Sequence, residues 1–242
     1  MKDYLQDIVK NTYTLGVIDL VKIVGTQKET TLNTMSSDNS VVIKAKFHNV
    51  IPEFQGTFGM PNLNKLNTIL NIPEYREDAN ITVKTKKAND IDVPSYISFD
   101  NKSADFTNEY RLMNQSTIEE MLKTPKFKGA NWNIEFEPSN QNIQRLRFQA
   151  SANSEETSFA FKQENKNLKI FFGDHSTHAG NFVFQADVTG NLSKQTYYPV
   201  GIVLAVLNLA GDKRIKLTDS VMLITVDSGL AVYEYIIPAL TK

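Results

Sequence analysis

The chain contains no cysteine, and this absence removes several kinds of chemistry at once. Without cysteine there is no disulfide bond, no thiol nucleophile and no cysteine-ligated zinc site. Such a composition is compatible with a reducing cytoplasm. Histidine is also scarce, with three in 242 residues, and only His175 and His178 lie close together in the sequence. We therefore expect no cofactor and no resident metal.

The sequence also lacks the common phosphate-binding and nucleophile motifs. It contains neither Gly-x-x-x-x-Gly-Lys nor Gly-x-Gly-x-x-Gly, and no Gly-x-Ser-x-Gly. No apolar run approaches the roughly 20 residues needed to span a membrane. Residues 1–6 are polar and mixed in charge, unlike a secretory signal. These absences favour a non-enzymatic protein without a membrane segment.

The two neighbouring histidines could still hold a metal together with Asp174. They lie between Gly173 and Gly180, in a segment that separates two expected strands. Glycine at both ends of a polar segment is typical of a solvated loop, which explains the pattern better. A metal-dependent enzyme that uses His175 and His178 is therefore kept only as an alternative.

Overall composition indicates a folded protein and gives no argument for a nucleic-acid partner. Hydrophobic residues make up 41% and charged residues 22%, and the length fits one large domain or two ordinary ones. The net charge is −1. A DNA-contacting protein of this charge must gather its basic residues on one face, so their positions matter more than their number.

The sequence contains signs of an internal duplication. Residues 5–12 and 118–125 share a pattern of apolar, polar, acidic, apolar, apolar and Lys positions. Two later segments, 61–70 and 199–209, each open with proline, which suits the first position of a helix. Each half then contains a short helix, several strands, a second helix and more strands. We expect domains at residues 1–108 and 109–242.

Hydrophobic periodicity predicts four helices and many strands. The helices are expected at 3–13, 61–70, 199–209 and from Ser116, which forms a capping box with Glu119. Because helices and strands do not alternate one for one, we expect an α+β fold with antiparallel sheets. The strands are expected at 18–24, 30–35, 41–47, 81–86, 94–99, 106–113, 132–137, 145–150, 158–163, 168–173, 182–188, 213–217, 222–226 and 232–237.

Basic residues recur near the expected helices. Lys10 and Lys123 occupy matching positions in the two similar octets, and Lys65 lies off the apolar stripe of its helix. A solvated helix face would explain each lysine alone. Matched lysines in repeated units favour a common DNA-facing surface instead. The candidate DNA-binding residues are Lys10, Lys65, Lys123, Lys126, Lys128, Lys213 and Arg214.

Four stretches resemble sliding clamps, the ring-shaped processivity factors of DNA replication. They are residues 2–11, 34–41, 116–122 and 233–240. The resemblance is to the clamps of T-even-type bacteriophages and, more distantly, to PCNA. It implies the DNA clamp fold, with duplicated helix-plus-antiparallel-sheet domains, two per chain. Three chains would form a ring of six domains in the cytoplasm of a phage-infected bacterium.

The resemblance also implies partners. The ring would encircle duplex DNA without reading its sequence, and it would bind a DNA polymerase and a clamp loader through a pocket between domains. The residues that it assigns to partner binding are Met35, Val41, Phe99, Tyr235, Pro238 and Leu240. One departure is that the helix expected at 199–209 has no basic residue. The rival from another class is a structural virion protein built from duplicated β-rich domains.

Overall fold

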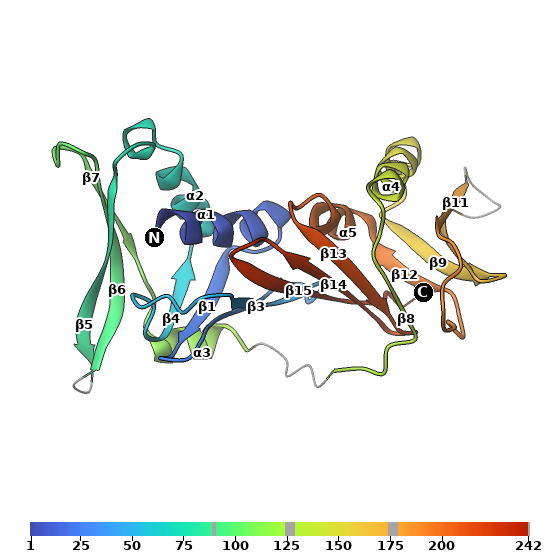
Figure 1. Cartoon of the computed structure of the whole chain (residues 1–242), viewed down its shortest axis with the longest axis horizontal. Coiled ribbons are helices and arrows are strands. Elements are labelled where there is room, and N and C mark those ends of the chain that lie inside the picture. Colours follow the sequence, from blue (N-terminus) through green and yellow to red (C-terminus); the bar gives the residue numbers. More distant parts are fainter. Residues whose placement is uncertain (89–90, 124–128, 174–178, 242) are drawn as a thin grey trace. The chain divides into compact units, whose positions relative to one another are not determined.

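The computed structural model describes residues 1–88, 91–123, 129–173 and 179–241. It confirms the α+β fold with antiparallel sheets (Figure 1). The chain forms two compact units. The first contains residues 1–125 together with 228–233, and the second contains 126–227 together with 234–242. The boundary expected after residue 108 lies within a strand, whereas the compact units divide after Pro125.

The first unit contains three α-helices, two short 3-10 helices and seven strands of its own among its described residues. The helices are α1 (Lys2–Asn11), α2 (Leu63–Leu70) and α3 (Gln115–Met121). Four of its strands follow one another in the order β4-β1-β2-β3, within a sheet that continues into β15, and a separate sheet runs in the order β5-β6-β7. The strands are β1 (Leu20–Gly25), β2 (Thr30–Met35), β3 (Val42–Phe47), β4 (Gly56–Pro61), β5 (Asn80–Ala88), β6 (Ile91–Asp100) and β7 (Thr107–Arg111).

The second unit contains α4 (Asn140–Ala152) and α5 (Val200–Leu207). Its strands run in the orders β11-β10-β9-β12 and β15-β14-β13-β8. The last strand begins in the first unit, at residues 231–233, and ends in the second. The strands are β8 (Ile134–Phe136), β9 (Ser158–Glu164), β10 (Asn167–Phe172), β11 (Gly180–Gln185), β12 (Thr196–Pro199), β13 (Asp212–Leu217), β14 (Val221–Asp227) and β15 (Ala231–Pro238).

The element order shows the duplication directly. In both halves a helix is followed by three strands, a fourth strand, a second helix and three more strands. The strand orders agree as well, because β4-β1-β2-β3 corresponds to β12-β9-β10-β11. Helix α1 therefore corresponds to α4, and α2 corresponds to α5. Strands β5, β6 and β7 correspond to β13, β14 and β15.

The octet match in the sequence pointed to the wrong helix. Residues 118–121 belong to α3, which packs on β4 of the first unit and has no counterpart in the repeat. Ile118 lies against Gly59, where an added Cβ would stand 2.9 Å from the Ile118 Cδ1 atom. Gly59 and Met113 exchange backbone hydrogen bonds of 2.9 and 2.8 Å beside this contact. The absence of a side chain at Gly59 thus lets α3 lie close to the strand.

The true counterpart of α1 was predicted as a strand. Residues 145–150 lie inside α4, a helix of 13 residues. The segment alternates basic and apolar residues, which mimics a half-buried strand. The helical signal is weaker but present: Ser139 accepts a hydrogen bond from the Asn142 backbone N–H at 3.2 Å, and Ile143 and Leu146 are buried at helical spacing.

Three expected helix starts are also wrong. Pro61 ends strand β4, and Asn62 caps α2 by accepting from the Lys65 backbone N–H at 3.2 Å. Pro199 ends β12 and α5 begins at Val200. The cap of α3 is Asn114 and not Ser116, since the Asn114 side chain accepts from the Thr117 backbone N–H at 2.9 Å. In each case the helix begins one or two residues away from the expected position.

Candidate nucleic-acid interface

The first unit presents two lysines on a pair of packed helices. Helices α1 and α2 lie against each other (Figure 1). Each buries an apolar stripe against its own unit. Lys10 lies in the last turn of α1 and Lys65 in the first turn of α2, and both are exposed. The Tyr13 hydroxyl, just after α1, donates a 2.8 Å hydrogen bond to Asn64 of α2. Two of the predicted DNA-binding residues are therefore brought onto one helix pair.

The second unit presents two arginines on the equivalent helix pair, and the sequence analysis missed both. Arg145 and Arg147 are exposed on α4, which packs against α5. The Arg147 guanidinium donates to the side chain of Asn208, the residue that caps the C-terminus of α5. A cation is favoured at that end of a helix because of the helix dipole. Recognising α4 as a helix would have placed both arginines among the candidates.

Helix α5 has no basic residue for a structural reason. Its sequence is apolar almost throughout, and Val200, Ile202, Val203, Val206 and Leu207 are all buried. The helix therefore serves as core, and α4 supplies the charge of the pair. The departure noted in the sequence is thus compensated by residues 145 and 147 on the neighbouring helix.

The remaining cations are less suited to contact DNA. Lys213 and Arg214 lie on β13 and not on a helix. Partial burial lowers the pKa of Lys213, whose Nζ donates to the Gly211 carbonyl at 2.8 Å. Arg214 pairs with Glu135 at 3.2 Å and with Glu137 at 3.0 Å, and these carboxylates raise its pKa. Both charges are therefore partly compensated within the unit.

The other lysines that were predicted lie near the end of the first unit. Lys123 is exposed but follows α3, so it does not match Lys10 in the repeat. Lys126 and Lys128 lie outside the described residues. The argument from position-matched lysines is therefore replaced by one from matched helices: Lys10 on α1 and the two arginines on α4.

The residues that the resemblance assigned to partner binding fall into two groups. Val41, Phe99 and Tyr235 are fully buried, so they support the core of the chain as described. Met35 is half-buried, whereas Pro238 and Leu240 are exposed. After β15 the chain stays bonded, because the Ala239 N–H donates to Ser220 and the Leu240 N–H donates to Tyr197, each at 2.8 Å. Of the predicted set, Met35, Pro238 and Leu240 are therefore the residues that offer surface to a partner.

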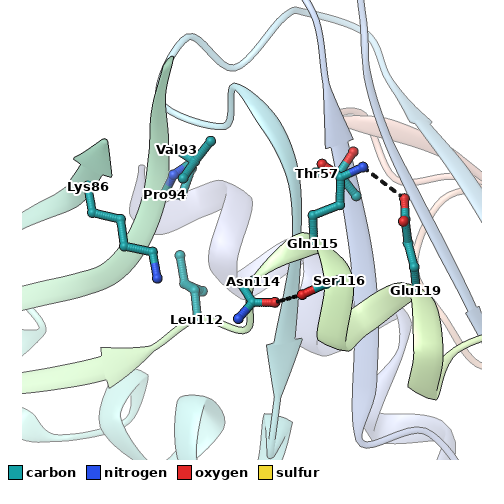
Figure 2. Close-up of a pocket in the computed structure, with 9 residues that line it drawn as sticks. All are labelled: Thr57, Lys86, Val93, Pro94, Leu112, Asn114, Gln115, Ser116 and Glu119. Carbon is teal, nitrogen blue, oxygen red and sulfur yellow. Dashed lines mark hydrogen bonds between the residues drawn. The ribbon is translucent and has the colours of Figure 1, made fainter. Parts of the chain in front are cut away.

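A pocket of about 400 Å³ lies in the first unit, between the end of β5, the start of β6 and the start of α3 (Figure 2). Val93, Pro94 and Leu112 supply apolar surface, while Lys86 and Glu119 supply opposite charges. None of the partner-binding residues predicted from the sequence lines it. The sequence did not predict this pocket, because the pocket depends on the packing of α3 beside Gly59, and no local sequence pattern indicates that contact.

The described residues offer no arrangement for catalysis by a metal. Within residues 1–88, 91–123, 129–173 and 179–241, no three His, Asp or Glu side chains form a cluster that could hold a metal ion. His175 and His178 lie outside this range, so the metal-site alternative stays untested. In the same described part of the chain, no helix is long and apolar enough to cross a membrane.

Comparison with solved structures identifies the fold. The chain is similar over its full length to PCNA of A. fulgidus, in a structure with the C-terminal region of FEN-1 bound, with a TM-score of 0.73 and 12% identity. The match covers 96% of that chain. PCNA of Thermococcus kodakaraensis gives a TM-score of 0.67 and 11% identity, over 98% of this chain and 97% of that one. The chain therefore has the fold of PCNA-like sliding clamps.

Sequence comparisons add no closer relative. No protein-family model matches the chain, and a search of curated proteins finds no match. Because identity with the solved structures is low, their likeness concerns the fold, and function must be argued from this chain's own residues.

Proposed function

We propose that this protein is a sliding clamp, a non-enzymatic ring that encircles duplex DNA and tethers a replicative DNA polymerase. The observation that carries the proposal is the match to PCNA-like clamps over the whole chain, including both repeats. The exposed cations of the two equivalent helix pairs agree with it. The bacteriophage origin and the host cytoplasm rest on the resemblance of the four sequence stretches.

Assembly into a ring of three chains is supported by the repeat itself. Within the first unit, β3 is followed in the strand order by the beginning of β15. The repeat equates β3 with β11 and β15 with β7, and both β11 and β7 end their sheets in the strand order. Pairing β11 of one chain with β7 of the next would therefore repeat a junction that the chain already makes. A head-to-tail contact of this kind closes into a ring under three-fold rotation.

The chemistry of the helix pairs suits a partner that must slide. Phosphate attraction is electrostatic and independent of sequence, so a few exposed cations per chain suffice. Lys10, Lys65, Arg145 and Arg147 provide four such cations on helices. Topological enclosure, and not tight binding, would then keep the protein on DNA.

The proposal also includes the docking of partner proteins. A. fulgidus PCNA is seen with the C-terminal region of FEN-1, and by analogy this chain would bind short segments of a polymerase and a clamp loader. Pro238 and Leu240 are the exposed members of the predicted set. A truncation of residues 239–242 should therefore abolish stimulation of the polymerase.

A DNA-retention assay tests encirclement without a loader. Linear DNA is anchored to a bead at one end, the protein is threaded over the free end, and that end is then blocked by a bound antibody. We expect retention through a high-salt wash only when the end is blocked, because salt weakens phosphate contacts but not enclosure. Equal loss from blocked and open DNA would overturn the proposal.

A further inference from the structure

Helix α4 carries a phenyl ring where a purely electrostatic DNA surface needs none. Phe148 is 68% exposed, the largest exposed fraction among the exposed large apolar side chains of the described residues. Exposed apolar surface on an otherwise polar face points to a binding role when the neighbours share a chemistry. The residues on the same face of α4 do so.

The exposed face of α4 combines one ring with polar and cationic groups. Positions 141, 144, 145 and 148 are neighbours at three- and four-residue spacing. They carry Gln141, Gln144, Arg145 and Phe148, and all four are exposed. Ile143 and Leu146 lie on the buried side. The face therefore offers amide groups, a guanidinium and an aromatic ring together.

The elements that make most of the contacts with α4 carry no carboxylate among their described residues. Helix α4 packs against α5, β10 and β11, and none of these four elements contains an Asp or a Glu. Their cations are Arg145, Arg147 and Lys169, of which Lys169 is paired with Glu164 of β9 at 2.8 Å. Such a face complements a polyanion. An acidic peptide would match the positive charges of this face, but its carboxylates would leave the phenyl ring of Phe148 without a stacking partner.

We propose that the exposed face of α4 binds single-stranded DNA, with Phe148 stacking on an unpaired base and Arg145 contacting the adjacent phosphate. The bases of a duplex are stacked on one another and present no open face, so the ring would distinguish single-stranded from double-stranded DNA. Aromatic side chains beside cations are how single strands are held without regard to sequence. The inference rests on the proposed function, in which the clamp would meet unpaired template beside a primer end.

Fluorescence anisotropy with the full chain tests the inference. The probes are a fluorescein-labelled oligothymidylate and a duplex of the same length, both at low salt. Loss of one stacked base weakens single-strand binding by about 5- to 150-fold. We therefore expect Phe148→Ala and Phe148→Leu to show that loss on the oligothymidylate and less than about a 2-fold change on the duplex. Phe148→Tyr keeps the ring and should keep the affinity.

Two further variants separate stacking from charge and from general stickiness. Arg145→Ala should weaken both probes and reduce the salt dependence, because it removes a phosphate contact. Met121→Ala is the matched control, since Met121 is 62% exposed but lies on α3. It should change neither probe.

Results that contradict single-strand binding by α4 can be told apart from results that contradict the clamp proposal. Unchanged oligothymidylate binding by Phe148→Ala, in a protein still retained on end-blocked DNA, would overturn the inference alone. A lower native mass of Phe148→Ala with unchanged single-strand binding would show that another copy of the chain covers the phenyl ring of Phe148. That result would also overturn the inference. Loss of end-dependent retention by the unaltered chain would instead overturn the proposed function.

Discussion

Asp7 and Tyr233 form a buried hydrogen bond that connects two segments 226 residues apart. The Tyr233 hydroxyl donates to Asp7 Oδ2 at 2.8 Å, and the Asn11 side chain donates to Oδ1 at 3.0 Å. Asp7 lies on α1 and Tyr233 on the part of β15 that belongs to the first unit. Replacing Tyr233 with Phe removes the hydroxyl and keeps the ring, so it isolates this bond.

Burial raises the pKa of Asp7 above its ordinary value of 3.8, although hydrogen bonds from Tyr233, Ser228 and Asn11 and the charge of Lys10 oppose the shift. The folded chain therefore holds a proton on Asp7 over a pH range in which the unfolded chain has lost it. Stability from this group is highest below the ordinary pKa and falls as the pH rises through the raised value. Above the raised pKa, where Asp7 is ionised, its charge depends on the hydrogen bonds from Tyr233, Ser228 and Asn11.

We expect Tyr233→Phe to lower the free energy of unfolding by about 2 kcal/mol at pH 7, because a hydrogen bond to a charged group contributes about 1.5–3 kcal/mol. Below the ordinary pKa of 3.8, where Asp7 is protonated in the folded chain, the loss should be nearer 1 kcal/mol, as for a neutral pair. Urea unfolding at fixed protein concentration measures both values, which keeps assembly constant. Asp7→Asn should flatten the dependence on pH, since it removes the titrating group.

The control is Tyr13→Phe, which removes a hydroxyl that bonds to Asn64 at 2.8 Å in an exposed setting. Its effect should stay within about 0.5 kcal/mol. An equal loss for Tyr233→Phe at both pH values would refute the reasoning, because the bond would then not involve a carboxylate that titrates. A loss no larger than that of Tyr13→Phe would refute it as well.

The remaining expectations concern the helices and the C-terminus. Replacing Lys10, Lys65, Arg145 and Arg147 together with Ala should leave the fold intact and make DNA binding less dependent on salt, as measured by titration at several salt concentrations. An unchanged salt dependence would show that these four cations do not contact DNA. Ile118→Ala should cost about 2–5 kcal/mol in urea unfolding, since the side chain is fully buried, whereas a cost as small as that of Met121→Ala would show that α3 does not support the first unit. Deleting residues 239–242 removes two backbone hydrogen bonds and should cost about 1–3 kcal/mol without unfolding the chain, with polymerase stimulation lost; full stimulation would place docking elsewhere.

Much of the fold follows from local pattern. The long strands of both units lie within a few residues of their expected positions, because alternating or β-branched apolar runs specify half-buried strands directly. Helices α1, α2 and α5 were also expected; their starts shifted by one or two residues, and α1 and α5 end two residues earlier than expected. Strands β4 and β12 were missed, since each ends at a proline that was assigned to the following helix.

The errors at the site have one physical source. Helix α4 buries only Ile143 and Leu146 and leaves Phe148 exposed, so its apolar stripe is too narrow to identify it as a helix. Without α4, the octet at residues 118–125 became the partner of α1 by default. Its actual role depends on a long-range contact with Gly59, which tertiary structure alone reveals. Arg145 and Arg147 were lost from the candidate site for the same reason.

The measurement that tests the clamp assignment most directly is the native mass in solution by light scattering, at several protein concentrations. A ring of three chains requires a species of three times the chain mass of 27.3 kDa, with nothing larger forming as concentration rises. We expect that trimer, because β7 and β11 are edge strands of their sheets in the described part of the chain, and pairing β11 of one chain with β7 of the next would close the ring. A stable monomer at all concentrations, or a series of assemblies that grows without limit, would contradict it.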